Sequence, residues 1–156
     1  MRTIHWLYLV SVLLFVAGVS FVVVGAKASQ RSSSLVTPIA SIKEIMNGMI
    51  MPASDAVFAA VSTSVTKAGI EEKAPKNDAE WQALTNQAAM LVEAGNLMLV
   101  DGRMKDQGEW VKLSQTFIDA SKVALDGARA RKADAVFASG EAIDKICDSC
   151  HEKYQK

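Results

Sequence analysis

The stretch Ile146-Cys147-Asp148-Ser149-Cys150-His151-Glu152-Lys153-Tyr154, near the end of the chain, decides the fold class that we predict for the whole sequence. It contains both cysteines of the protein, spaced C-x-x-C and followed at once by a histidine. This is the pattern for covalent attachment of a c-type haem. Residues three and four apart share one face of a helix, so Cys147, Cys150 and His151 can address one flat ligand together. We therefore predict one covalent haem c, with Cys147 and Cys150 as the thioether donors and His151 as the proximal iron ligand.

Three other interpretations of the two cysteines compete with haem attachment. A thioredoxin-like dithiol would begin a helix after a strand, and no strand pattern precedes Cys147. A structural zinc site needs about four protein ligands, whereas the only histidine outside the motif is His5. A plain disulfide is the third alternative. The adjacent histidine favours haem attachment over all three.

Upstream of the motif, apolar residues recur at intervals of three and four, as is typical of amphipathic helices. The chain has three prolines and nine glycines in 156 residues and no sustained alternation of apolar and polar positions, which favours helices over strands. The pattern predicts four helices. They are expected over residues 37–65, from Asn77 to before Asp101, from Trp110 to near Arg131, and over a last stretch that carries the motif.

The first of these helices contains a proline. Its apolar stripe is Ile39, Ile42, Met46, Met49, Ala53, Ala56 and Ala60. Pro52 lies within the stripe, where it removes a backbone hydrogen bond and bends the helix unless it opens a separate one. Because the stripe continues in phase across Pro52, we predict one kinked helix.

The later helices carry their own signals. Asn77 followed by Glu80 is a capping-box-like start for the second helix. Small residues in the stripes either leave room for a planar cofactor or allow close helix contact; they are Ala88, Gly95, Ala120 and Gly140. The inner side of the last helix is expected to present Val136, Phe137, Gly140, Ile143, Ile146 or Cys147, and Cys150. Four helices of about 30 Å each, joined by mostly short connections, predict an all-α antiparallel four-helix bundle.

An uncharged run of 21 residues, Trp6 to Ala26, lies between Arg2 and Lys27. It is either an export signal, cleaved after Ala28, or a membrane anchor. We therefore divide the chain into a signal peptide or anchor (1–28), a polar linker (29–36) and a haem-binding domain (37–156). Both interpretations place the domain outside the cytoplasm. The expected location is the periplasm, either soluble or attached to the inner membrane through residues 6–26.

Composition argues against several other functions. The formal net charge is zero, so nothing indicates a nucleic-acid partner. Glu71 and Glu72 lie among lysines in a charged loop, which is typical of a solvated surface rather than of acid–base chemistry. No hydrolase or phosphate-loop pattern occurs, and we predict that the protein is not an enzyme.

With CDSCH at the end of a fourth helix and Tyr154 behind it, the chain resembles the cytochrome c′ superfamily over residues 37–156. The resemblance implies a haem inside the bundle, faced on its open side by a residue of the first helix. In the low-spin relatives that residue is a methionine. The matching position makes Met46 the candidate distal ligand, with Met49 as its nearest competitor. Tyr154 matches an aromatic residue near the haem edge, whereas Gln155 departs from the arginine often found next.

The resemblance implies a monohaem cytochrome that carries single electrons between redox partner proteins on the periplasmic side. Ligation by His151 and Met46 would stabilise the reduced iron and exclude small ligands. The alternative is a five-coordinate, cytochrome c′-like binder of nitric oxide or other small gases, in which isoleucines crowd the open face. Because many members of the superfamily are dimers, a homodimer is a further expectation.

Overall fold

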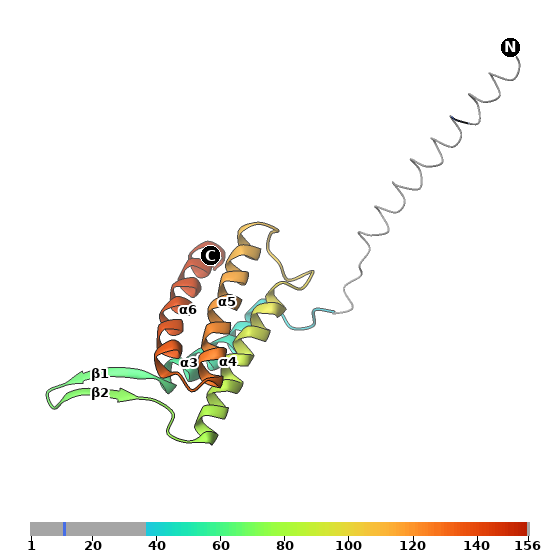
Figure 1. The fold of residues 1–156 in the computed structure, drawn as a ribbon. Coiled ribbons are helices and arrows are strands. Elements are labelled where there is room, and N and C mark those ends of the chain that lie inside the picture. The colour runs from blue at the N-terminus through green and yellow to red at the C-terminus, as the bar shows by residue number, and fades with distance from the viewer. Residues whose placement is uncertain (1–10, 12–36, 156) are drawn as a thin grey trace, which may run out of the picture. The chain divides into compact units, whose positions relative to one another are not determined.

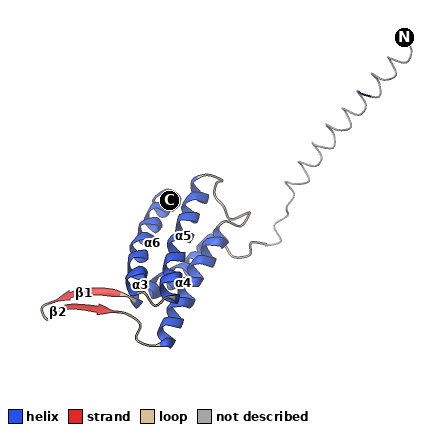
Figure 2. Cartoon of the chain, viewed as in Figure 1, coloured by secondary structure: helices blue, strands red, loops and turns tan. Residues whose placement is uncertain are grey.

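The computed structural model describes Ser11 and residues 37–155. The predicted signal peptide or anchor (1–28) and linker (29–36) therefore lie outside the described residues, apart from Ser11. The described chain from residue 37 onward belongs to one compact unit, Val36–Lys156. Figure 1 and Figure 2 show that this unit is mostly helical, as predicted, with one small sheet that was not predicted. Between residues 37 and 155, no helix combines the length and the apolar character needed to cross a bilayer.

Four helical columns and one hairpin make up this unit. The first column consists of three contiguous segments: α2 (Ile42–Ile45), the π-helical η1 (Met46–Ile50) and α3 (Met51–Ala60). The hairpin follows, with strands β1 (Ser62–Thr66) and β2 (Gly69–Lys73). The other three columns are α4 (Asp78–Met98), α5 (Glu109–Arg129) and α6 (Ala133–Tyr154).

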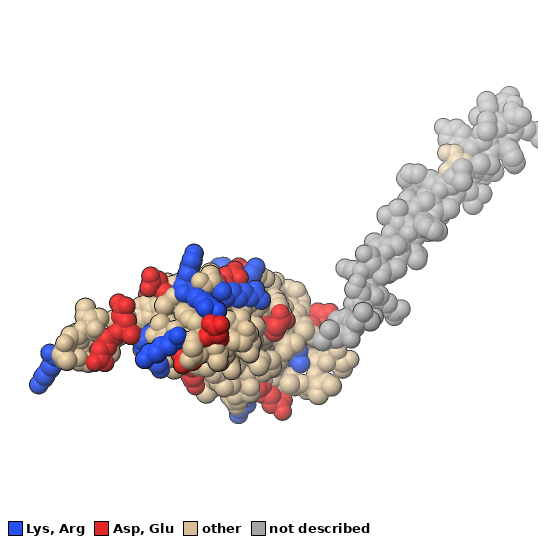
Figure 3. Space-filling view, turned by 60° about the horizontal axis from the view of Figure 1, so that its bottom comes forward, with Lys and Arg blue, Asp and Glu red and all other residues tan. Residues whose placement is uncertain are grey.

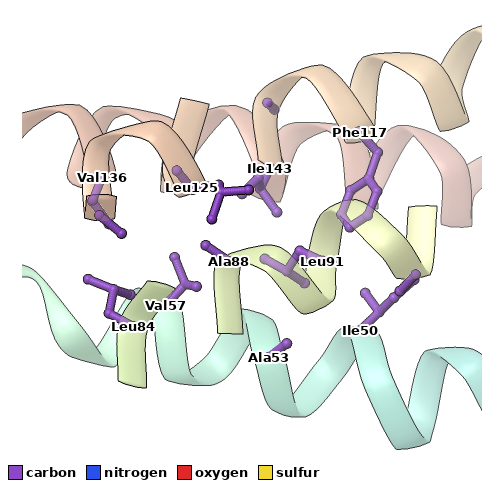
Figure 4. Packing of buried hydrophobic residues seen from close by; sticks show 14 of the residues in the cluster. Ile50, Ala53, Val57, Leu84, Ala88, Leu91, Phe117, Leu125, Val136 and Ile143 are labelled. Atoms are coloured by element: carbon purple, nitrogen blue, oxygen red, sulfur yellow. The ribbon is translucent and has the colours of Figure 1, made fainter. Parts of the chain in front are cut away.

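Successive columns run in opposite directions, as the labelled core residues of Figure 4 show. Along one direction, α4 passes from Leu84 to Leu91 and α6 passes from Val136 to Ile143, whereas α5 and the first column run the other way. The start of the first column, the end of α4, the start of α5 and the end of α6 therefore share one end of the bundle. We call this the motif end, because α6 carries the cysteines there.

The core lies between the columns and is built from aliphatic side chains. The largest fully buried apolar side chains are Ile45, Leu91, Ile143, Val57 and Val136, with Phe117 and Trp110 almost as buried. Burying one such aliphatic side chain stabilises the fold by about 1.5–3 kcal/mol. On the face drawn in Figure 3, acidic and basic side chains are interspersed.

The hairpin corrects the predicted first helix, which was expected to run from residue 37 to 65. The helix instead begins at Ile42 and ends at Ala60, and Val61 is already extended with φ −131° and ψ 120°. Three of the five residues in Ser62–Thr66 are β-branched, namely Thr63, Val65 and Thr66, and such residues favour strands. Its partner strand begins at Gly69, where φ is +131°, a conformation that favours glycine. The expected charged connection thus contains β2, and Val65 faces Ile70 across the sheet.

The first column is continuous across Pro52, but its buried side differs from the predicted stripe. Ile39 is 91% exposed and precedes the helix, and Met46 and Met49 are only half-buried. The residues that are buried are Ile45, Ile50, Ala53, Ser54, Val57 and Val61. The π-helical segment explains the change, because it widens one turn and allows Ile45 and Ile50, five residues apart, to be buried together.

Pro52 gives this wider turn a physical reason. A proline inside a helix has no N–H to donate, and its ring crowds the carbonyl four residues earlier. Immediately before Pro52, the Met51 N–H donates to the Met46 carbonyl, five residues back. Pro52 itself is the second residue of α3, so its missing N–H falls where the π-helical turn passes into the α-helix.

The later helices follow the predictions more closely. The Asn77 side chain accepts from the Glu80 N–H at 3.0 Å, and its amide donates to Glu80 Oε1 at 2.8 Å, which confirms the predicted start of α4. One inner residue of α6 was wrong, because Phe137 is 53% exposed. The buried line of α6 instead passes through Val136, Ser139 and Ile143, and the Ser139 hydroxyl is satisfied by the Val136 carbonyl at 2.6 Å.

Gly95 permits close contact between α4 and α5. A Cβ added there would lie 2.6 Å from Ile118 Cγ1 and 3.1 Å from Phe117 Cδ1. We expect Gly95→Ala to destabilise the protein, because overpacking of about 1–3 kcal/mol exceeds the gain of about 1 kcal/mol in helix propensity. Gly48→Ala is the matched control, since an added Cβ there meets nothing within 4 Å. Urea unfolding of both variants measures the difference; equal midpoints would show that the α4–α5 contact relaxes freely.

Candidate functional site

The C-x-x-C-H motif lies on the last turns of α6, as the sequence predicts. The helix begins after a turn in which Arg131 adopts a positive φ of 55°, and it continues to Tyr154. Cys147 and Cys150 are half-buried, whereas His151 is exposed. The side chains of Cys147 and Ile146 pack against the apolar core. The motif therefore lies at the boundary between the core and solvent.

Both thiols are free in the structure. Burial, with the carboxylate of Asp144 as the next cause, raises the pKa of the Cys147 thiol to about 11. Burial and the nearby Glu109 also raise the pKa of Cys150. Redox-active dithiols have a lowered pKa and commonly lie at the N-terminus of a helix. Here the cysteines are near the C-terminus of α6, where the helix dipole disfavours a thiolate, so the site does not have the character of a thioredoxin-like dithiol.

The His151 imidazole is exposed and makes no hydrogen bond or ion pair with any described residue. It follows Cys150 directly and lies four residues after Cys147, so the three side chains occupy adjacent positions on one or two turns. An unpartnered imidazole beside two free thiols is a donor set that suits covalent haem attachment and iron ligation.

Tyr154 packs against α5 and the loop that precedes it. Its ring meets Trp110 edge-on, with centroids 5.0 Å apart and an interplanar angle of 81°. Its hydroxyl donates to Asp106 Oδ2 at 2.5 Å. Burial and this contact raise the pKa of Tyr154 to about 12, and the hydrogen bond from Tyr154 is the main cause that lowers the pKa of Asp106. The predicted role of Tyr154 at a haem edge stays a prediction.

Asp106 was missed in the sequence, although its local pattern gave a signal. Its Oδ1 accepts from the Gly108 N–H at 2.8 Å and from the Trp110 N–H at 3.1 Å, so it caps the start of α5. An aspartate just before a helix is a recognised capping signal. Nothing in the sequence indicated that its second oxygen bonds to a residue 48 positions away.

Met46 and Met49 are both half-buried and pack against the apolar core from the first column. Both precede Ile50 in the first column. Figure 4 shows Ile50 beside Phe117, in the part of the core nearer the motif end. Met51 is 57% exposed. The fold therefore brings Met46 and Met49 to the same end of the bundle as the cysteines, and ligation by either stays a prediction.

Two buried hydroxyls in α5 lack a partner. Ser114 Oγ and Ser121 Oγ make no hydrogen bond, although the residues are 1% and 0% exposed. Such unsatisfied groups usually cost about 1–3 kcal/mol each. Ser114 is near the start of α5, at the motif end, whereas Ser121 lies beyond the middle of the helix. With the free thiols and the unpartnered imidazole, the buried Ser114 hydroxyl fits a motif end whose residues are suited to a further group.

A groove of about 360 Å³ lies elsewhere, at the end of the bundle next to the hairpin. Its walls include Ala56, Ala60, Pro75 and Leu84. None of the predicted site residues lines this groove, so the candidate site is the one on α6.

Within the described residues, no group of three or more histidine, cysteine, aspartate or glutamate side chains is arranged to hold a metal ion. Comparisons with known protein families, with characterised proteins and with solved structures found no match. The functional assignment therefore depends on the residues of α6 and on what surrounds them.

Proposed function

We propose that the protein is a monohaem c-type cytochrome that carries single electrons between redox partner proteins on the periplasmic side. The observation that carries the proposal is the C-x-x-C-H motif on the last turns of a helix, with both thiols free and the imidazole unpartnered. The four-column helical fold supports the resemblance to the cytochrome c′ superfamily, because the motif is on the last column and a methionine-bearing first column reaches the same end.

Each residue of the proposed site has a separate task. Cys147 and Cys150 hold the cofactor covalently, which prevents its loss where it cannot be recovered. His151 provides the proximal nitrogen ligand and Met46 the distal thioether. A bound haem supplies the one-electron redox change, and a thioether ligand favours its reduced state. With His151 and Met46 both bound, the iron would keep nearly the same ligands in its two oxidation states and would leave no position for small ligands.

The alternative, a five-coordinate binder of nitric oxide or similar gases, also has an observation in its favour. Met46 is only half-buried and lies beside the buried face of the first column. Ile45 and Ile50 are 2% and 4% exposed and belong to that face. If these isoleucines cover the distal face, the iron has no sixth protein ligand. The alternative and the preferred function share the same covalent site on α6.

The optical spectrum of the reduced protein tests the proposal. We expect a low-spin c-type spectrum that carbon monoxide leaves unchanged, because two side chains occupy both axial positions. A reduced protein that is high-spin and binds carbon monoxide would identify the gas binder instead. A purified protein without covalent haem, from cells that attach haem to another c-type cytochrome, would refute both.

A further inference from the structure

The connection between α4 and α5, residues 99–108, contacts the two columns that carry the proposed iron ligands. We call this connection the strap. It leaves α4 at the motif end, passes the residues just before α2, and then reaches the last turn of α6 before α5 begins. Leu99 and Met104 pack against the apolar core, so the strap is not a solvated loop.

At its first contact, the strap is fixed to the start of the first column. Gly102 has a φ of +88°, and a Cβ added there would lie 3.3 Å from Pro38 Cγ. Arg103 Nε donates to the Ala40 carbonyl at 3.0 Å, across 63 positions of sequence. Ala40 directly precedes Ser41, whose capping box with Glu44 fixes the first turn of α2. Met46 follows within the same continuous column.

Arg103 also anchors the strap to α4. Its Nη1 donates to the Leu97 carbonyl at 3.2 Å, and the residue is 9% exposed. The last carbonyls of a helix lack partners within it and carry the negative end of the helix dipole, so a buried guanidinium is stabilised there. The planar guanidinium holds its donors in a rigid fork, so it can donate to two carbonyls with less loss of side-chain freedom than the rotatable donors of a lysine.

At its second contact, the strap is fixed to α6. Asp106 Oδ2 accepts from the Tyr154 hydroxyl, while Asp106 Oδ1 caps α5. Trp110 supports this contact from the side, because its ring meets Tyr154 and its Nε1 donates to the Met98 carbonyl at 3.0 Å. Tyr154 lies three residues after His151, within one turn of α6. The strap therefore connects the start of the Met46 column with the turn that carries His151.

From these contacts we infer that the strap sets the spacing between Met46 and His151, with Arg103 and Tyr154 as its two positioning residues. Neither Arg103 nor Tyr154 is proposed to bind the iron. The inference rests on the proposed function, because a spacing matters to the chemistry only if both side chains bind one iron. Loss of either contact would allow the first column to move away from α6, so that Met46 would reach the iron in fewer of the molecules.

Four variants of the full-length holoprotein test this inference. Tyr154→Phe removes the hydroxyl but keeps the ring against Trp110, and Arg103→Met removes both carbonyl contacts while keeping a long side chain. Asp78→Asn is the control, because it removes a side-chain contact between elements away from the motif end, the exposed 3.0 Å ion pair with Arg131 that joins the start of α4 to the α5–α6 turn. Arg103→Lys is the conservative partner of Arg103→Met.

We expect Tyr154→Phe and Arg103→Met each to raise the fraction of reduced protein that binds carbon monoxide roughly fivefold or more. Arg103→Lys should fall between Arg103→Met and the unmodified protein, and Asp78→Asn should leave the fraction unchanged. Amide hydrogen exchange should accelerate in residues 42–50 of the two strap variants but not in residues 84–91. A loss of global stability alone does not produce this pattern, because it would accelerate exchange in both peptides.

The unmodified protein separates failure of this inference from failure of the proposed function. A protein without covalent haem refutes the function. A haem protein whose iron is open to carbon monoxide from the start overturns the Met46 ligation and the strap together. A low-spin protein whose strap variants keep its spectrum and its exchange rates leaves the electron carrier in place and overturns the strap alone.

Discussion

A protein in which Cys147 and Cys150 are both replaced by alanine is expected to lose its covalently held haem completely. The reason is chemical, because no other cysteine exists in the chain to form a thioether. Alanine is the best helix former, and both cysteines are only half-buried in α6, so the helix itself should persist. Haem staining of the denatured polypeptide and its intact mass measure the loss directly.

The single variants and a neighbouring serine provide the controls for this result. Cys147→Ala and Cys150→Ala should each keep one thioether and a reduced yield of holoprotein. Ser149→Ala changes a residue between them whose hydroxyl only donates to the Lys145 carbonyl of the same helix, at 2.9 Å, and it should keep full haem content. Haem that stays with the double variant through denaturation would contradict the assignment of the motif.

Replacement of Met46 by leucine is expected to convert the iron from low spin to high spin and to open it to carbon monoxide. Leucine has nearly the volume of methionine and usually costs less than about 1.5 kcal/mol in a core, so the change isolates the loss of the sulfur. The optical spectrum of the reduced variant, with and without carbon monoxide, measures the effect.

Met49→Leu is the matched control for Met46→Leu, because Met49 is also half-buried, belongs to the same π-helical segment and packs against the same core. It should keep the spectrum of the unmodified protein. The reverse result, in which only Met49→Leu changes the spectrum, would identify Met49 as the distal iron ligand. Two unchanged spectra would exclude both Met46 and Met49 as the distal ligand.

Where local signals were strong, the sequence predicted the fold well. The Asn77–Glu80 pair fixed the start of α4 because both its donors and acceptors lie within four residues. The hairpin was not predicted because its strands have only five residues each and neither face of the hairpin is buried. No alternation of apolar and polar residues therefore marks these strands in the sequence. The predicted first helix was extended to residue 65, although its apolar stripe ended at Ala60, where the observed helix also ends.

In the candidate site, too, the sequence predicts the features that depend on neighbouring residues but not the contacts between distant ones. The placement of Cys147, Cys150 and His151 on one helix follows from their spacing alone. Contacts such as Arg103 with Ala40, 63 positions apart, leave no mark in the pattern of either segment, because one partner is a backbone carbonyl that any residue could supply. The face on which Met46 lies depends on a π-helical turn that apolar periodicity does not reveal.

That turn gives the first column one place where its length can change. In a π-helical turn residues five apart share a face, as the buried Ile45 and Ile50 do. Removing one residue between them would leave an ordinary α-helical turn, in which residues four apart share a face, so both isoleucines would stay buried. Elsewhere in the column the same deletion would rotate the residues on either side by about 100° relative to each other. Among descendants of this chain, a change of one residue in the length of this column is therefore expected between Ile45 and Ile50 rather than elsewhere.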